Sequence, residues 1–118
     1  MKIYVHYNCS SCKKALKWLE ANGHKPEVLN LLETTPTESE FRQMTAAYDG
    51  NLKKLLNTSG QLYRSMGLKD QIPTMTAEEV YTLLSREGML VKRPFLLIGS
   101  EAGIVGFKEA EWEAQLQG

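Results

Sequence analysis

The chain is short and electrically balanced. It has 118 residues, with 14 lysines and arginines against 14 aspartates and glutamates. This length suits one domain with a hydrophobic core of its own. The neutral balance gives no electrostatic footprint for nucleic acid or for an anionic membrane surface. We therefore expect neither as a partner and look instead for a small molecule or a protein.

Targeting signals are not expected either. The longest apolar runs, such as residues 94–98, are only long enough for a strand, and residues 1–5 lack the apolar core and cleavage site of a signal peptide. We therefore expect a cytoplasmic protein. In that compartment a cysteine pair is typical of catalysis, redox sensing or metal binding rather than of a structural disulfide.

The first third of the chain predicts a β-α-β unit. Residues 2–7 suit a strand with Ile3 and Val5 on one face, a helix is predicted from residue 10 or 11 to residue 22, and residues 27–31 suit a second strand. Since a helix connects the two strands, we expect them to be parallel. A thioredoxin-like fold begins with such a unit.

The middle of the chain is predicted to be helical. Two capping-box patterns begin helices that run to about residues 48 and 86, namely Thr37 with Glu40 and Thr76 with Glu79. Shorter helical segments are expected over residues 52–56 and 61–66. No linker, repeat or low-complexity stretch sets this block apart. We therefore interpret residues of about 36–88 as a helical insertion in a single domain that spans residues 1–118.

The last part of the chain predicts a β-hairpin followed by a helix. Residues 95–98 and 104–107 have strand character, Gly99 and Gly103 are assigned to the loop between them, and residues 109–116 suit the closing helix. The whole order is β-α-β, a helical block, then β-β-α. It predicts an α/β fold of the thioredoxin-like kind, with a mixed four-stranded sheet.

Cys9 and Cys12 are the only cysteines, and they stand where the first strand turns into the first helix. Cys9 is expected at the helix N-terminus, where unpaired N–H groups and the helix dipole favour a thiolate, and Cys12 follows about one turn later. This spacing allows the pair to close a disulfide, so dithiol redox chemistry is the leading interpretation. Zinc would need four ligands and only His6 lies nearby, so we expect no metal and no bound cofactor. Two inert buried thiols are the other alternative.

Four segments, in order, carry a resemblance that covers essentially the whole chain. They are residues 7–15 around the cysteines, the turn at 57–63, the approach to a strand at 89–94, and residues 105–112. Together they resemble the arsenate reductase/Spx family. The resemblance implies a thioredoxin-like fold with a helical insertion, which agrees with the order of elements above.

The resemblance also implies roles for particular residues. The family's nucleophile falls on Cys9, its arginine before a proline falls on Arg93, and Pro94 resembles the cis-proline of thioredoxin-like folds. Only an X-Pro bond can be cis at low cost, so we predict a cis bond before Pro94 that brings the Arg93 side chain to the Cys9 sulfur. Cys9, Cys12 and Arg93 are therefore the catalytic candidates, and Pro94 is a binding candidate.

Three further residues are candidates for binding. Lys13, which follows the cysteine pair, would favour the thiolate. Lys53 matches the first of three arginines by which glutaredoxin-coupled arsenate reductases hold arsenate. Arg93 matches the second, and the third falls in residues 106–108, where there is no arginine. Asn57 opens a turn that is either structural or ligand-binding, and structural turns are the commoner case.

The predicted activity is thiol–disulfide exchange, in which Cys9 attacks a disulfide and Cys12 resolves the mixed disulfide. We expect a small thiol or disulfide, or a protein disulfide, as substrate, with glutathione or another thiol as reductant, and a monomeric protein. Two alternatives stay open. A glutaredoxin-coupled arsenate reductase would need arginines that are absent here. An Spx-type transcription regulator would resemble chains with a longer, basic C-terminal tail than this one, which stops at Gly118.

Overall fold

The computed structural model describes residues 1–117, and Gly118, the last residue of the predicted domain, lies outside them. No helix of the described part has the length and apolar character needed to cross a membrane. The elements, with short 3-10 helices named η, are β1 (Lys2–Val5), α1 (Ser10–Ala21), β2 (Glu27–Asn30), α2 (Glu38–Ala47), η1 (Leu52–Leu55), α3 (Gln61–Ser65), α4 (Leu68–Gln71), η2 (Ile72–Thr74), α5 (Ala77–Arg86), η3 (Gly88–Leu90), β3 (Phe95–Ile98), β4 (Ala102–Val105) and α6 (Glu109–Leu116).

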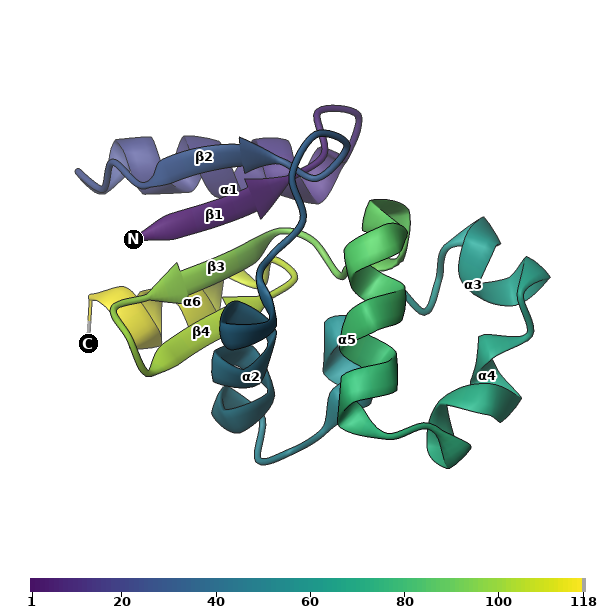
Figure 1. The fold of residues 1–118 in the computed structure, drawn as a ribbon. Coiled ribbons are helices and arrows are strands. Elements are labelled where there is room, and N and C mark those ends of the chain that lie inside the picture. The colour runs from purple at the N-terminus through teal and green to yellow at the C-terminus, as the bar shows by residue number, and fades with distance from the viewer. Residues whose placement is uncertain (118) are drawn as a thin grey trace.

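A mixed four-stranded sheet forms the centre of the fold, in the order β2-β1-β3-β4. β1 and β2 are parallel, as predicted, whereas β3 pairs antiparallel with both β1 and β4. The helices α1 and α6 cover one face of the sheet, and α2 lies on the other (Figure 1). The rest of the helical insertion, α3 to α5, extends past one end of the strands (Figure 1). The predicted α/β fold with a mixed four-stranded sheet is therefore confirmed.

Side chains that alternate along the strands divide the core into two parts. Ile3 and Val5 share one face of the sheet, as predicted. The helices α1 and α6 cover that face, and Trp112 of α6 is fully buried there. Tyr4 and Phe95 point to the opposite face, where they belong to the apolar cluster formed with the insertion. Their rings pack edge to face with 6.0 Å between the ring centroids. Since both faces of the sheet are apolar, helices are required on both sides.

The β-hairpin is shifted from its predicted position. β3 begins and ends as predicted, but β4 covers Ala102–Val105 rather than 104–107, so the connecting loop holds only residues 99–101. Gly103, which we assigned to the loop, therefore lies within the strand. A Cβ atom on Gly103 would lie 2.7 Å from the sulfur of Met44 on α2, so this glycine allows close packing of the helix on the sheet.

Both predicted capping boxes are present. The side chains of Thr37 and Thr76 accept the N–H groups of Glu40 and Glu79, and the two carboxylates accept the threonine N–H groups in return. Between these helices, α4 and η2 occupy a stretch for which we predicted no element. A four-residue helix followed by a turn at Pro73 is too short to show a helical period in the sequence.

Glu40 also joins α2 to the sheet. Its carboxylate accepts hydrogen bonds from the Tyr4 hydroxyl at 2.7 Å and from the Lys2 ammonium at 2.9 Å. Burial alone would raise the pKa of the Glu40 carboxyl, but hydrogen bonds from Thr37, Tyr4 and Lys2 outweigh burial and hold the pKa below its usual value of 4.5. The charged carboxylate therefore stabilises the fold above that pH, and its contribution is lost as the pH falls.

We expect Glu40→Gln to lower the free energy of unfolding by about 1–2 kcal/mol at pH 7, because the amide keeps the shape but removes the charge that strengthens the hydrogen bonds from Lys2, Tyr4 and Thr37. Urea unfolding at pH 7 and at pH 3 measures the effect, and the difference from the parent protein should shrink at pH 3.

Arg42→Gln is the control for this prediction. Arg42 is an exposed residue that pairs with Glu38 and Glu78 and lies over the Tyr81 ring, and losing such surface contacts should change little. An equal loss at both pH values would mean that the charge of Glu40 is not what stabilises the fold.

Candidate active site

Cys9 caps the helix that follows β1. The strand ends at Val5, two residues earlier than predicted, because the chain turns tightly and the Cys9 N–H donates to the His6 carbonyl at 3.1 Å. The Cys9 sulfur then accepts the N–H of Cys12 at 3.3 Å and serves as the N-cap of α1. Half-buried Cys9 thus holds its sulfur where the N–H groups of a helix stabilise negative charge.

Cys12 lies one helical turn further on and is buried, with 1% of its surface exposed. Burial is the main cause that raises the pKa of the Cys12 thiol to about 12. The neighbouring Cys9 side chain raises the pKa further, whereas a hydrogen bond with the His6 backbone and the charge of Arg93 lower it. Cys12 is therefore a protonated thiol near neutral pH, directly beside a more accessible sulfur.

Arg93 and Pro94 approach the cysteines from the start of β3. The pairing of β1 with β3 ends at Tyr4 opposite Phe95, so the two residues before Phe95 come beside the end of β1 that leads to Cys9. The Arg93–Pro94 peptide bond is cis, as predicted, whereas the Arg93 guanidinium bonds to backbone carbonyls and not to the Cys9 sulfur to which we expected it to be brought. The strand order brings this segment beside the chain that leads to the N-terminus of α1.

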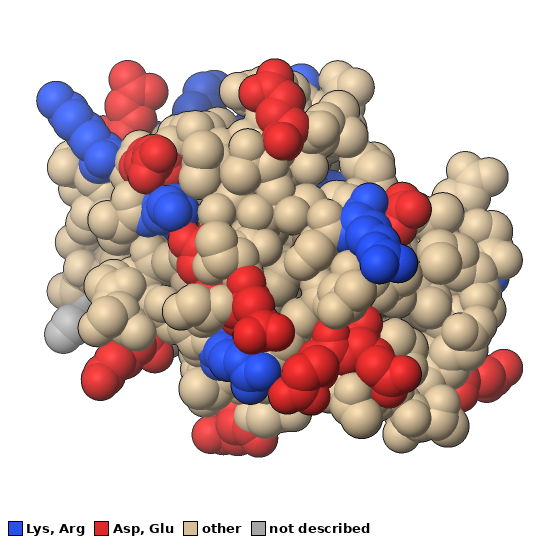
Figure 2. Space-filling view, in the orientation of Figure 1, with Lys and Arg blue, Asp and Glu red and all other residues tan. Residues whose placement is uncertain are grey.

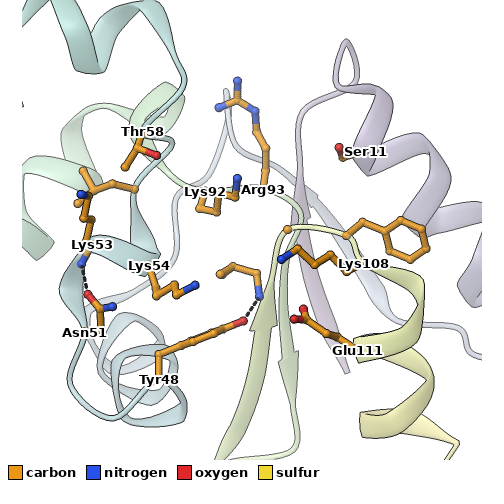
Figure 3. A pocket seen from close by; sticks show the side chains of 14 residues that line it. Ser11, Tyr48, Asn51, Lys53, Lys54, Thr58, Lys92, Arg93, Lys108 and Glu111 are labelled. Carbon is orange, nitrogen blue, oxygen red and sulfur yellow. Dashed lines mark hydrogen bonds between the residues drawn. The ribbon is translucent and has the colours of Figure 1, made fainter.

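The Arg93 side chain is fixed by backbone oxygens. Its guanidinium donates to the carbonyls of Met89 at 3.0 Å and of Val91 at 3.4 Å. In Figure 3 it points away from Lys54 and Lys108. Because its charge still lowers the pKa of Cys12, Arg93 acts as a fixed positive charge near the cysteine pair.

A pocket of about 430 Å³ opens beside the cysteine pair, between the helical insertion and the sheet. Ser11, in the first turn of α1 after Cys9, lies on one side of it, and Thr58 of the insertion lies on the other (Figure 3). A backbone bridge between Leu56 and Val91 holds the insertion against the approach to β3. The two walls of the pocket therefore come from distant parts of the chain that this bridge brings together.

The pocket is strongly basic although the chain as a whole is neutral. It is lined by one carboxylate, that of Glu111, and by five cations, namely Lys53, Lys54, Lys92, Arg93 and Lys108. None of the five lies within 4.0 Å of a carboxylate oxygen of residues 1–117. The positive charge of the pocket is therefore available to an anion from solution.

The opposite arrangement is seen on the face that carries α2 and α5. There acidic and basic groups lie side by side (Figure 2). Arg42, for example, pairs with Glu38 at 3.6 Å and with Glu78 at 3.1 Å. Positive charge on that face is neutralised locally, so the surplus at the pocket is a property of this site and not of the whole surface.

The structure brings most of the predicted site residues together. Cys9, Cys12, Arg93 and Pro94 meet at the end of β1, and Lys53 lines the adjoining pocket. These five residues come from three separate segments of the chain.

Two of the predicted binding residues are placed elsewhere. Lys13 is exposed on α1 and does not line the pocket. Asn57 is held in its turn, where its N–H donates to the Leu90 carbonyl at 2.7 Å and its side-chain oxygen accepts the Ser59 hydroxyl at 3.3 Å. These contacts fit the structural interpretation of the turn.

Lys54, Lys92 and Tyr48 are pocket residues that the sequence analysis did not identify. The Lys54 ammonium lies 5.6 Å from the centre of the Tyr48 ring, and the Tyr48 hydroxyl accepts the Val105 N–H at 3.0 Å. The signal in the sequence is two pairs of adjacent basic residues, at 53–54 and 92–93. Neither pair by itself indicates that the two lie close together in the fold. No three His, Cys, Asp or Glu side chains gather as a metal site within the described chain.

Cys9 is expected to be alkylated well before Cys12, by roughly tenfold or more, because Cys9 is the more exposed and Cys12 is buried and protonated. Brief treatment of the reduced protein with iodoacetamide at neutral pH, followed by fragment mass spectrometry, measures the order of labelling. The two single serine variants assign the labelled positions. Equal rates, or labelling of Cys12 first, would reverse the roles assigned to the two thiols.

Comparison with known proteins places these features in one family. Residues 4–115 match the model of the ArsC family. The uncharacterized protein YusI of Bacillus subtilis (strain 168) is 36% identical, over 96% of this chain and 95% of YusI. The regulatory protein MgsR of the same organism is 27% identical, over 94% of this chain and 86% of MgsR. The crystal structure of a possible arsenate reductase from Streptococcus mutans UA159 matches with a TM-score of 0.85 and 30% identity, over 98% of this chain and 97% of that one.

Proposed function

The chain belongs to the ArsC family and has its thioredoxin-like fold, and from this premise we propose that it is a thiol–disulfide oxidoreductase that acts through Cys9 and Cys12. One observation carries the proposal: the accessible Cys9 sulfur accepts the Cys12 N–H at the start of α1, and the Cys12 thiol is buried directly beside it. Exchange requires an accessible nucleophile and a protected second thiol within reach.

The proposed reaction has two steps. The Cys9 thiolate attacks one sulfur of a substrate disulfide, forms a mixed disulfide and releases the other half as a thiolate. Cys12 then loses its proton, attacks the Cys9 sulfur and releases the second half as a thiol. The substrate disulfide gains two electrons, and the cysteine pair loses them and becomes a disulfide.

A reductant must then restore the two thiols. We propose a low-molecular-weight thiol such as glutathione, which is oxidised to its disulfide in the same two-electron exchange. This cycle requires a reducing compartment such as the cytoplasm, where disulfides of this kind are transient.

The test is a titration of the reduced protein with 2-hydroxyethyl disulfide in the absence of oxygen. The proposal predicts the loss of both thiols, the release of mercaptoethanol, and an internal disulfide between Cys9 and Cys12 that mass spectrometry detects. Protein that has first been blocked with iodoacetamide is the control. Retention of both thiols in the presence of excess disulfide would refute the proposed function.

A redox-switched regulator is the second candidate, and the identity with the regulatory protein MgsR favours it. In that case the disulfide would change the affinity for a protein partner, and no substrate would turn over. Pull-downs with the reduced and the oxidised protein separate the two candidates. Capture of a partner in one redox state alone, without catalytic turnover of any disulfide, would favour the regulator.

Arsenate turnover with glutathione and glutaredoxin is expected to be absent or very weak. Lys53 and Lys108 lie in the pocket, but a lysine cannot make the paired hydrogen bonds of an arginine to an oxyanion, each worth roughly 1.5–3 kcal/mol. The measurement is a coupled NADPH assay on the parent protein and on the Lys53→Arg/Lys108→Arg variant, which should gain activity. Strong turnover by the parent protein would mean that lysines suffice.

A further inference from the structure

We infer that the basic pocket selects the sulfur substrate by its charge, and that the preferred partner of Cys9 is a small thiol or disulfide that bears several phosphate groups. This inference rests on the proposed function, because it names the substrate class of the exchange at Cys9. The position, the charge and the size of the pocket support it.

The pocket lies next to the start of the helix that Cys9 caps, although neither Cys9 nor Cys12 lines it. Ser11 lines the pocket and lies two residues after Cys9, in the first turn of the helix that Cys9 caps. Arg93 lines it as well, and its charge lowers the pKa of Cys12. A molecule held in the pocket would therefore present one end to the cysteine pair.

Lys54, Lys92 and Lys108 carry the charge that faces the pocket, since the Arg93 guanidinium points away from Lys54 and Lys108 (Figure 3). Lys54 and Lys108 extend toward each other from opposite sides of the pocket, with Lys92 between the two walls (Figure 3). The Lys92 side chain passes close to Gly106, since a Cβ atom there would lie 3.3 Å from the Lys92 Cε atom. Like charges that face one another without a paired carboxylate repel, and a multivalent anion between them removes this repulsion.

The kind of cation favours phosphate. Four of the five pocket cations are lysines, which act as flexible point charges, whereas the one arginine is already bonded to the carbonyls of Met89 and Val91. Each lysine point charge can meet a different phosphate of a molecule that carries several, whereas holding a single oxyanion or a flat carboxylate depends on the paired hydrogen bonds of an arginine. Glutathione carries two carboxylates and an ammonium group and would therefore leave most of the pocket charge unmatched.

The size favours a small molecule over a protein surface. A volume of about 430 Å³ lies within the usual range for pockets that hold small ligands and cofactors. The half-buried rings of Tyr48 and Phe107 supply apolar surface beside the charged groups. The site therefore fits a compact molecule that has a phosphate-bearing part and a neutral thiol arm.

A series of disulfides with the same thiol arm and increasing phosphate content tests this inference. Pantethine has no phosphate, dephospho-coenzyme A disulfide has a diphosphate, and coenzyme A disulfide has one further phosphate. We expect the rate of mixed-disulfide formation on the Cys12→Ser protein to rise along this series, roughly tenfold or more between its ends at low salt. The difference should shrink at about 0.5 M salt because the charges are screened.

Matched variants assign the charge effect to the pocket. Lys54→Gln and Lys92→Gln should each lower the ratio of the coenzyme A disulfide rate to the pantethine rate by several-fold. Lys25→Gln removes the same charge from an exposed position outside the pocket and should leave the ratio as it is. Equal rates along the series, or a ratio that the Lys54→Gln and Lys92→Gln substitutions do not change, would overturn the inference. The proposed function would still stand in that case, provided that the protein reacts with pantethine.

Direct binding provides a readout that does not depend on exchange. Desulfo-coenzyme A, which lacks the sulfur, should bind to the Cys9→Ser protein in calorimetry, and Lys54→Gln should weaken the binding. Binding without exchange of any disulfide would uphold the pocket as a phosphate site and refute the proposed function instead. Failure to bind, together with equal rates along the series, would refute the phosphate preference.

Discussion

Replacing Cys9 by serine is expected to abolish disulfide reduction, by roughly a thousandfold or more, whereas replacing Cys12 by serine is expected to stop the reaction halfway. A serine at position 9 can still accept the Cys12 N–H and cap α1, so the fold should persist while the nucleophile is lost. A serine at position 12 leaves Cys9 free to attack but removes the thiol that releases it. The mixed disulfide on Cys9 should therefore accumulate.

Intact-protein mass spectrometry after exposure to 2-hydroxyethyl disulfide distinguishes these outcomes. The Cys12→Ser protein should gain one mercaptoethanol adduct, and the Cys9→Ser protein should gain little or none. Circular dichroism and thermal unfolding serve as the control that both variants are folded. A folded Cys9→Ser protein that still reduces disulfides would remove Cys9 from the reaction, and an adduct mainly on Cys12 would exchange the roles.

The parts of the fold that could be predicted depend on residues close together in the sequence. The capping box of Thr37 with Glu40 spans four residues, and the cysteine pair lies where strand spacing changes to helical spacing. The β4 boundary was missed because it depends on a distant contact. A glycine in a hairpin reads as a loop residue, and only the Met44 side chain on α2 explains why Gly103 lies within the strand.

The same distinction applies to the candidate site. The cysteine pair and the cis bond before Pro94 follow from local pattern and from a family resemblance. The basic pocket does not, because overall neutrality hides a local surplus of charge. The backbone pairing of residues 55–57 with residues 90–92, which includes the bridge between Leu56 and Val91, brings the basic pair at 53–54 to the one at 92–93. A sequence pattern gives the chemistry of a site more readily than the surface that selects the substrate.

The release of substrate by Cys12 is expected to accelerate about tenfold for each pH unit between pH 6 and pH 8. Burial, the main cause of the raised Cys12 pKa, persists when Cys9 is in a mixed disulfide, although the contribution of the free Cys9 side chain is then lost. Cys12 is therefore mostly protonated over this range. Since the thiolate attacks and the thiol does not, the rate should follow the fraction of Cys12 that is ionised. As long as the pH is below the pKa, this fraction rises tenfold for each unit by which the pH increases.

Stopped-flow absorbance measures this step directly. The Cys9 mixed disulfide with thionitrobenzoate releases a coloured thiolate that stays ionised throughout the range, so only the state of Cys12 changes with pH. Arg93→Gln should slow the release at each pH, because the charge of Arg93 lowers the pKa of Cys12, and the Cys12→Ser protein should release nothing. A release rate that does not change with pH would mean that a neighbouring group takes the Cys12 proton during the attack. The buried thiol would then need a base that we have not assigned.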